Sequence, residues 1–320
     1  SDNTTAIAGR AGEMGEATHL ILLNSSPKIA ARVTFKEEGA IMRPTALMPY
    51  GDKGFLIGLQ RAKRGGTDEA RAILAYVNRA GKIIWQRTFM PGTTTTLEAI
   101  LPSETKSGVI WVGGTTVIEK RATAFLAGFD KNGGLMWQHL FRRGRAASIT
   151  SLAADPDGLV YAGGTIYPAN STDNLPAGWL ARFDYGGNPM WNLYLQGDDA
   201  YETRAVKAPQ SGFVNIYMQS APKMDKKGKY VSGKSFVRGV RVSSEGHSVQ
   251  QAVYDQGEGL SITIFGDNLP GTKLMLAGGQ VMMPTEDKNA DQTVKGQEEE
   301  GWLAGLPAFP NYENPCLSSQ

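Results

Sequence analysis

The sequence predicts an all-β fold, a β-propeller made of four-stranded antiparallel blades. Residues 147–195 contain four short strand-like runs separated by turn residues. This unit recurs along the chain at a period of about fifty residues, which is typical of propellers, solenoids and arrays. The 320 residues include 39 Gly and 16 Pro, without a collagen-like period. That composition suits a fold with many tight turns.

The central unit defines strands A to D of one blade. Strand A is expected over Ser148–Ala154, strand B over Leu159–Ile166, strand C over Gly178–Asp184 and strand D over Met190–Leu195. Asp, Pro, Gly and Asn fill the hairpins between them, as in residues 155–158. Short β-rich runs bounded by these residues indicate antiparallel strands joined by tight turns.

The same order of strands is expected on both sides of the central unit. The chain begins with C-like and D-like strands and ends with A, B and C-like strands. The expected strands are 19–24 and 28–35; 42–48, 54–60, 72–78 and 82–89; 95–102, 108–117, 124–130 and 135–141; 201–208, 212–219, 235–242 and 248–255; and 260–268, 273–282 and 301–309.

The hairpin between strands C and D has the same length in five repeats. An Asp or Asn can bond the turn backbone, and a Gly three residues later supplies a positive φ. A Trp four residues after the Gly can staple one blade to the next and give its indole N–H a backbone partner. We expect a structural role for Asn78, Gly81 and Trp85, for Asp130, Gly133 and Trp137, and for Asp184, Gly187 and Trp191. Residues 243–250 keep the spacing without the Trp, and residues 24–31 keep only the length.

One stretch of the central unit carries a family resemblance. Leu180–Asp184, with Gly187 and Trp191, resembles the tryptophan-docking repeat of quinoprotein-type β-propellers. The neighbouring Gly158–Thr165 is similar to generic bacterial β-propeller repeats. The resemblance covers residues 19–309 and implies a bacterial propeller of the scaffold type, because the chain shows only the structural repeat of the dehydrogenases. Such repeats occur in enzymes and scaffolds alike, so they imply a fold and not an activity.

The number of blades depends on the two ends of the chain. Five blades close if the last A and B strands (260–282) join the first C and D strands (19–35), and we favour this arrangement because it leaves no open edge. A strand at 301–309 would instead require a sixth, partial blade, with 4–10 as a possible partner strand. The expected domains are an N-terminal extension (1–18), the propeller (19–309) and a C-terminal tail (310–320).

Composition narrows the possible classes of function. The formal net charge is +2, so the overall charge does not favour nucleic acid as a partner. Cys316 is the only cysteine, which rules out an intrachain disulfide and a CxxC motif. No run approaches the ~18 apolar residues of a membrane span. From the family type we expect a periplasmic or cell-surface protein whose signal peptide has been removed.

The connections between strands B and C vary in length and chemistry, unlike the C-to-D turns. In a propeller these connections and the D-to-A connections share one face, and function on repeat scaffolds concentrates in such variable loops. That face is the expected binding surface, with basic and acidic sectors that could orient a charged partner. Its candidate residues are Arg61, Lys63, Arg64, Arg142, Arg143, Tyr167, Lys223, Lys226, Lys227, Lys229, Glu298 and Glu299.

Signals of catalysis are weak. His19, His139 and His247 fall in different repeats, whereas metal or triad chemistry needs convergent side chains. We therefore expect no catalytic residue, no metal ligand and no cofactor, although a structural divalent ion on the propeller axis stays open. A glycosidase would need acids that converge on the axis, and the candidates for that role are Glu98, Glu202 and Asp267.

These observations favour a non-enzymatic scaffold that presents one loop face to a protein partner in the bacterial envelope, as an assembly factor or an inhibitor of a secreted protein. The alternative is a carbohydrate-binding or glycoside-cleaving propeller. Neither nucleic acid nor a membrane span is expected.

Overall fold

The computed structural model confirms the all-β propeller fold with four-stranded antiparallel blades. It describes residues 4–12, 15–65, 69–102, 108–169, 175–196, 200–221, 237–254, 264–268, 274–286 and 295–307, the last three ranges by their backbone alone. The described chain forms 22 strands in antiparallel sheets and a single 3-10 turn, Gly51–Lys53, with no α-helix. The described residues therefore contain no helix that is long and apolar enough to cross a membrane.

Four sheets contain four strands each, and every strand pairs with its neighbour in sequence. They are β4 (Ala40–Tyr50), β5 (Gly54–Lys63), β6 (Ala70–Asn78) and β7 (Ile83–Phe89); β8 (Thr95–Pro102), β9 (Ile110–Ile118), β10 (Arg121–Phe129) and β11 (Leu135–Phe141); β12 (Ala146–Ala154), β13 (Val160–Tyr167), β14 (Ala177–Phe183) and β15 (Pro189–Leu195); and β16 (Ala200–Gln210), β17 (Phe213–Ala221), β18 (Val237–Ser243) and β19 (Ser248–Tyr254).

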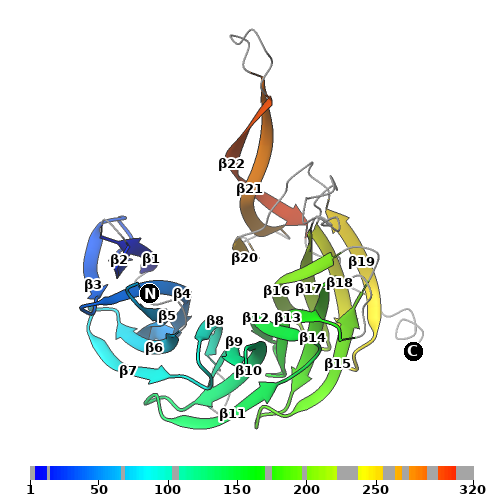
Figure 1. Cartoon of the computed structure of the whole chain (residues 1–320), viewed down its shortest axis with the longest axis horizontal. Coiled ribbons are helices and arrows are strands. Elements are labelled where there is room, and N and C mark those ends of the chain that lie inside the picture. The colour runs from blue at the N-terminus through cyan, green and yellow to red at the C-terminus, as the bar shows by residue number, and fades with distance from the viewer. Residues whose placement is uncertain are drawn as a thin grey trace.

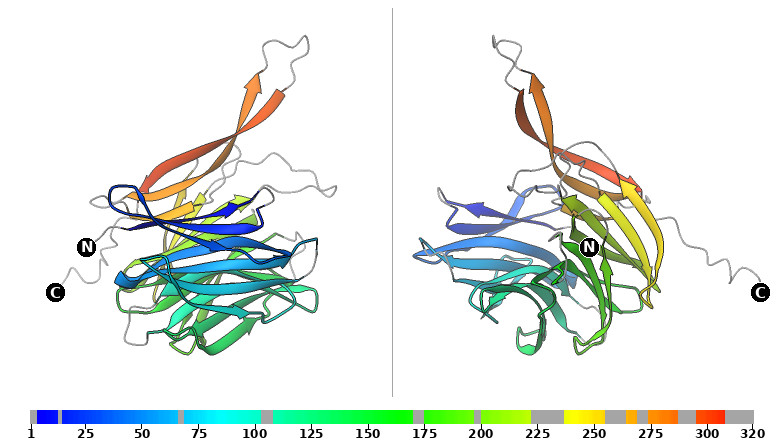
Figure 2. Two further views of the ribbon diagram at one scale, coloured as in Figure 1. Left: turned by 90° about the vertical axis from the view of Figure 1, so that its left-hand side faces the viewer. Right: turned by 45° about the vertical axis from the view of Figure 1, so that its right-hand side comes forward.

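A three-stranded sheet precedes these four and another follows them. The first contains β1 (Thr5–Ala11), β2 (Ala17–Leu23) and β3 (Ile29–Phe35). Five consecutive sheets, β1–β3 to β16–β19, lie around an arc with β4, β8, β12 and β16 on its inner side and β7, β11, β15 and β19 on its outer side (Figure 1). They agree with the five blades that the sequence favours. The side views show how closely the blades follow one another (Figure 2).

The ends of the chain pair differently from the closure that we expected. The last A and B strands do not join the first C and D strands. Instead β1, within the segment expected to be an extension, pairs with β2, and β20 (Ile264–Asn268), β21 (Leu274–Glu286) and β22 (Lys295–Pro307) form their own sheet. Each terminal strand is thus paired with a partner nearby in sequence, and such a loop costs less entropy to close than a pairing between the two chain ends.

The core consists of apolar layers between neighbouring blades. Leu20, Val33 and Phe35 of the first sheet pack against Ile57 and other buried residues of the second. Three further layers follow between the successive four-stranded sheets. Trp111, Trp179 and Phe125 are almost completely buried within them. Because each B and C strand lies between two such layers, these strands are apolar nearly throughout, as in sheets buried on both faces.

The repeated Trp residues connect one blade to the next, as the sequence predicts. Gly187 has a φ of 78°, and a Cβ built there would lie 2.4 Å from the ring of Trp137. The Trp85 ring packs in the same way against Gly133, and the Trp191 ring lies over Gly246. The indole N–H of Trp85 donates to Lys131 O at 3.1 Å, and that of Trp191 donates to Ser244 O at 2.7 Å. Each Trp therefore docks on the C-to-D turn of the following blade.

Candidate functional site

The B-to-C and D-to-A connections lie on one face, which we call the loop face. Two ion pairs show this directly. Arg61 near the end of β5 donates through Nε to Glu37 Oε2 at 2.7 Å, and Glu37 precedes β4. Arg142, which follows β11, lies 3.7 Å from Glu119 in the turn between β9 and β10. The hydrogen bond to Arg61 is the main cause of the lowered pKa of Glu37.

A group of cations on this face, which we call the basic sector, comprises Lys120, Arg121, Arg142, Arg143 and Arg145. The only acid in the same two connections is Glu119. Arg121 donates to the Gly144 carbonyl, which ties the β9–β10 turn to the segment after β11. Lys120, Arg143 and Arg145 are exposed, and their side chains make no hydrogen bond or ion pair with the described residues. Their charges are therefore available to a partner.

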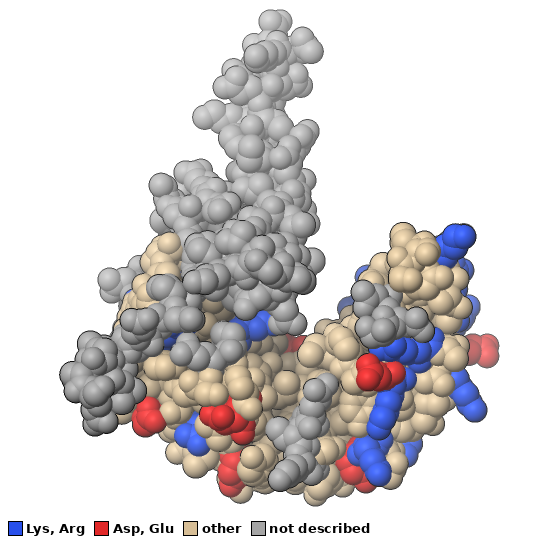
Figure 3. All heavy atoms as spheres, turned by 180° about the vertical axis from the view of Figure 1, so that it is seen from behind, with Lys and Arg blue, Asp and Glu red and all other residues tan. Residues whose placement is uncertain are grey.

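Further cations lie over the first two sheets. Seen from behind, Lys and Arg gather over the side of the arc formed by β1–β7 (Figure 3). The predicted residues Arg61 and Lys63 are on strand β5 rather than in a loop, and Arg64 follows directly. Arg61 is occupied by Glu37, whereas Lys63 is exposed. Because the ion pair neutralises Arg61, this residue contributes less to a binding surface than the sequence indicates.

The other predicted binding residues lie on strands or outside the described residues. Tyr167 ends β13, and burial together with the charge of Glu202 raises its pKa, so the phenol stays neutral. Glu298 and Glu299 were expected in a loop, but they lie on β22, where they pair with Met283 and Met282 of β21. Strand β21 continues to Glu286 and β22 begins at Lys295, so both strands reach into the segment expected to be a loop. Four predicted residues lie outside the described residues: Lys223, Lys226, Lys227 and Lys229.

On the opposite face, formed by the A-to-B and C-to-D turns, two Asp carboxylates accept hydrogen bonds within their own turns. Asp184 Oδ1 accepts hydrogen bonds from the Gly186 and Asn188 backbone N–H groups at 2.9 and 2.8 Å. Asp130 accepts from Asn132 and Gly134 in the same manner. The hydrogen bond from the Asn188 side chain, together with those from the backbone, lowers the pKa of Asp184. The backbone hydrogen bonds from Gly134 and Asn132 lower the pKa of Asp130. These carboxylates act as turn caps, as the sequence predicts.

The three histidines do not converge. His19 Nδ1 lies 3.0 Å from the Thr34 hydroxyl in the first sheet, and His139 Nε2 lies 2.8 Å from Gly186 O in a neighbouring turn. His247 belongs to the β18–β19 turn. Among the described residues no group of three or more His, Cys, Asp or Glu side chains could hold a metal ion.

The inner strands β4, β8, β12 and β16 each contain a β-bulge, and the bulged residues are polar. The register of each A–B pair shifts at the same point in four blades, and one A-strand residue has no partner there. The unpaired residues are Thr45, Glu98, Thr150 and Arg204. A bulge re-aims the side chain that it carries, and bulges are frequent next to functional sites. We call these four residues, together with Glu202 and Gln219, the axial cluster, a name that stands for their common register on the inner strands and not for mutual contact.

In two of the four blades a Gly-Gly pair of strand B lies opposite the bulge, Gly113-Gly114 in β9 and Gly163-Gly164 in β13. A Cβ on Gly164 would lie 1.8 Å from the Ser148 carbonyl oxygen. At Gly163 it would lie 2.1 Å from Val206 in the next blade. Gly163 and Gly164 therefore lie within β13, opposite the bulge at Thr150. In those two blades the Gly-Gly pair is a sequence signal for the bulge, because adjacent glycines in a strand mark a bulge or a close backbone approach.

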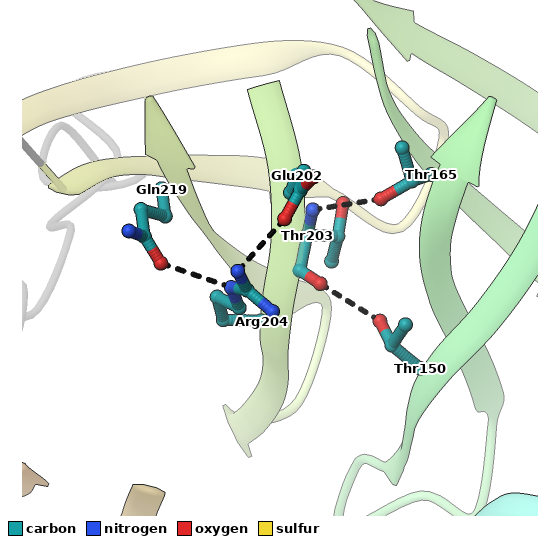
Figure 4. Close-up of polar contacts among 6 residues, drawn as sticks. All are labelled: Thr150, Thr165, Glu202, Thr203, Arg204 and Gln219. Carbon is teal, nitrogen blue, oxygen red and sulfur yellow. Dashed lines mark hydrogen bonds and ion pairs between the residues drawn. The ribbon is translucent and has the colours of Figure 1, made fainter. Parts of the chain in front are cut away.

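Hydrogen bonds order the axial cluster within and between blades (Figure 4). Arg204 donates through Nε to Gln219 Oε1 at 3.0 Å and through Nη2 to Glu202 Oε2 at 2.7 Å. Thr150 donates to Thr203 O at 2.9 Å, and the Thr203 N–H donates to Thr165 Oγ1 at 3.0 Å. The Glu202 and Arg204 side chains are 36% and 38% exposed, so solvent reaches the pair.

Glu98 is the unusual member of the axial cluster. Its only hydrogen bond to a described residue comes from Thr115 Oγ1, which donates to Oε1 at 2.8 Å. Burial raises the pKa of this carboxyl, and the hydrogen bond from Thr115 opposes that shift. The sequence names Glu98 and Glu202 as possible axial acids, and both lie on inner strands. Asp267 lies on β20, where only the backbone is described.

Comparisons with known proteins place the chain in no family. No protein-family model matches it, and no curated protein matches it. Similar solved structures include a mutant puromycin hydrolase complexed with PGG (11% identity, TM-score 0.48, covering 98% of this chain and 53% of the hydrolase). Others are a eukaryotic initiation factor (10%, 0.33, 79% and 63%) and a GH43 β-1,3-galactosidase with galactodeoxynojirimycin (11%, 0.38, 93% and 86%). The chain thus spans about half and about two thirds of the length of the first two. At this level of similarity, these structures carry no argument about its activity.

Proposed function

We propose that this chain is a non-enzymatic propeller that binds an acidic protein partner through its loop face. The observation that carries the proposal is the basic sector, where Lys120, Arg143 and Arg145 are exposed without an acid or acceptor among the described residues. Exposed charges of one sign steer a complementary partner and fix its orientation. On the opposite face the Asp130 and Asp184 carboxylates cap their own turns, and exposed lysines such as Lys82 and Lys131 occur one to a turn.

The propeller scaffold suits this role. Apolar layers join neighbouring blades, and from the second blade onward a Trp docks on the turn of the next blade, so the connections on the loop face are presented by a well-packed support. Recognition residues placed on rigid elements lose little conformational freedom on binding. We place this activity in the bacterial envelope, as an assembly factor or an inhibitor of a secreted protein, because the repeats resemble those of bacterial scaffold propellers.

Capture of a partner from envelope extract tests the proposal. The bait is the full chain, next to a variant that carries Lys120→Glu, Arg143→Glu and Arg145→Glu. A control variant, Lys82→Glu with Lys131→Glu, reverses two charges in the turns of the opposite face. We expect one stoichiometric acidic protein that binds the wild type and the control, binds more weakly as salt rises, and is lost with the triple variant. A partner retained equally by all three would place the interface elsewhere.

A further inference from the structure

The first blade lacks the inner strand that the four blades after it contain. Its sheet has the order β1-β2-β3, with β3 on the outer side of the arc and β1 toward its inner side (Figure 1). Asn24 Oδ1 accepts hydrogen bonds from the Ser26 and Lys28 backbone N–H groups, as the capping Asp does in other C-to-D turns. Strands β2 and β3 are therefore strands C and D, and β1 takes the position of strand B. Among the described strands none pairs with the other edge of β1.

The pairing register aligns β1 with strand B of the complete blades. Four residues before the capping Asn or Asp of the C-to-D turn, strand C pairs with Ala8 in the first blade and with Gly163 in the fourth. The same count leads to Gly113 in the third blade. Ala8 and Gly9 therefore take the positions of the Gly-Gly pairs in β9 and β13.

Gly9 has no structural requirement among the described residues. In the complete blades strand A passes close to this position, because a Cβ on Gly164 would lie 1.8 Å from Ser148 O and a Cβ on Gly114 would lie 2.0 Å from Thr96 O. A Cβ on Gly9 would have no described heavy atom within 4 Å, and Gly9 does not adopt a positive φ. A glycine within a strand marks a close approach of another backbone. Gly9 thus indicates a strand that passes along the free edge of β1.

The exposure of β1 supports the same conclusion. None of its residues is buried, and the Ile7 side chain is 51% exposed. Strands β5, β9 and β13, which hold the same position in complete blades, are buried along most of their length. An edge strand of this kind presents unpaired backbone N–H and C=O groups to an incoming strand.

The four A strands show which side chains such a strand must carry. In each of them the bulged polar residue is followed by a small residue, and that residue pairs with strand B at the position of Ala8 in the first blade. The small residues are Ala46, Ala99, Ser151 and Ala205. A strand beside β1 would meet the same constraint, because β4 of the next blade contacts β1 as well. Its residue opposite Ala8 should therefore be no larger than Ala or Ser.

We propose that β1 binds an extended segment of a partner protein, which becomes the fourth strand of the first blade. The A–B pairing of the other four blades is the template for this contact: backbone hydrogen bonds supply affinity, and the small residue opposite Ala8 supplies specificity. Strand β20, which follows the last complete blade, already pairs with β21, so the described chain leaves no strand for this place. The proposal does not depend on the loop-face function, since it uses β1 and not the basic sector.

Peptide binding to the full chain tests this strand site. The probes are four labelled synthetic peptides with the sequences of the A strands, residues 40–50, 95–102, 146–154 and 200–210, measured by fluorescence anisotropy. We expect at least one to bind and to slow the exchange of the β1 amides that point away from β2, as recorded by NMR. Gly9→Val should weaken binding by at least about tenfold, because its side chain occupies the space that the incoming backbone needs.

The matched control is Ala30→Val, which adds a similar bulk to an exposed position on β3 of the same blade. It should leave peptide affinity unchanged. Thermal melting should show that Gly9→Val folds as the wild type does, and Gly9→Ala is the milder variant if it does not. The loop-face triple variant should bind the peptides normally, so the strand site and the loop-face function can fail separately.

Four results would overturn the strand site. The first is no binding of any of the four peptides at about 1 mM, and the second is equal binding by wild type and Gly9→Val. The third is slow exchange of all β1 amides in the free monomer, which would mean that another segment of this chain fills the place. The fourth is slow exchange that appears only with dimer formation in sedimentation, which would identify a second copy as the occupant.

Discussion

The C-to-D turns and the B-to-C connections belong to the same blades but differ in almost every respect. The C-to-D turns keep one length, and their Asp or Asn and Gly positions bond within the turn or receive the Trp of the previous blade. The B-to-C connections range from the two-residue turn at Glu119 and Lys120 to much longer segments. The C-to-D turns satisfy their Asp or Asn groups internally and carry single exposed lysines, whereas the basic sector gathers three exposed cations, Lys120, Arg143 and Arg145. Under the proposed function, the C-to-D turns serve stability and the B-to-C connections serve recognition.

The largest expected effect tests the stabilising turns. Trp137→Ala removes a ring that contacts Gly187 of the next blade and lies 4.8 Å from Trp111, centroid to centroid. Because Trp137 is partly buried, we expect a loss near the lower end of the ~3–5 kcal/mol in the free energy of unfolding that fully buried aromatic residues cost. Urea denaturation measures it. A loss below about 1 kcal/mol would show that Trp docking does not couple the blades.

A smaller loss is expected from the turn cap. Asp184→Ala removes two backbone hydrogen bonds, and by analogy with helix caps we expect a loss of about 1 kcal/mol. The folded pKa of Asp184 is lowered, so its stabilisation is present above the unfolded pKa and is lost as pH falls through the folded value. Urea denaturation from pH 7 to pH 3 should show the difference between wild type and variant shrinking with acid. A constant difference would contradict the capping role.

The contribution of Glu98 to folding stability should change with pH in the opposite direction to that of Asp184. Burial raises the folded pKa of Glu98 above its ordinary value, so the wild type loses stability as pH rises through the interval between the unfolded and folded values. Glu98→Gln cannot ionise and should be as stable as the wild type or more stable at neutral pH, by up to about 1 kcal/mol. Melting temperatures from pH 4 to pH 8 test this. A variant that is less stable than the wild type throughout that range would contradict the view that burial disfavours the ionised Glu98 carboxylate.

The smallest effect on stability is expected in the basic sector. Arg143→Glu with Arg145→Glu alters exposed side chains without described partners, so we expect a change within about 0.5 kcal/mol. Partner capture should nevertheless weaken, because two of the three exposed cations of the basic sector are reversed. A marked loss of stability would mean that these cations belong to the folded framework and that the two faces do not divide the roles.

Sequence reasoning recovered the repeat because its signals are local. The spacing from Asp184 to Gly187 and Trp191 specifies a turn and its docking ring within eight residues, and the structure has both. Predicted strand ends in the central unit, such as Ser148–Ala154 against Ala146–Ala154, differ by no more than two residues. Charge placement was less accurate, because sequence does not show that Arg61 faces Glu37 or that Glu298 continues a strand.

The sequence by itself determined the all-β class, the blade period, the Trp register and the loop face, since each depends on residues within one hairpin or one blade. Only the tertiary structure decided how the chain ends pair, which cations remain unpaired and which side chains meet at the bulges. Those features depend on contacts between residues far apart in sequence. Gln60 and Thr96, 2.6 Å apart across two blades, are one example. No local pattern encodes such a contact, because it forms only after the blades pack.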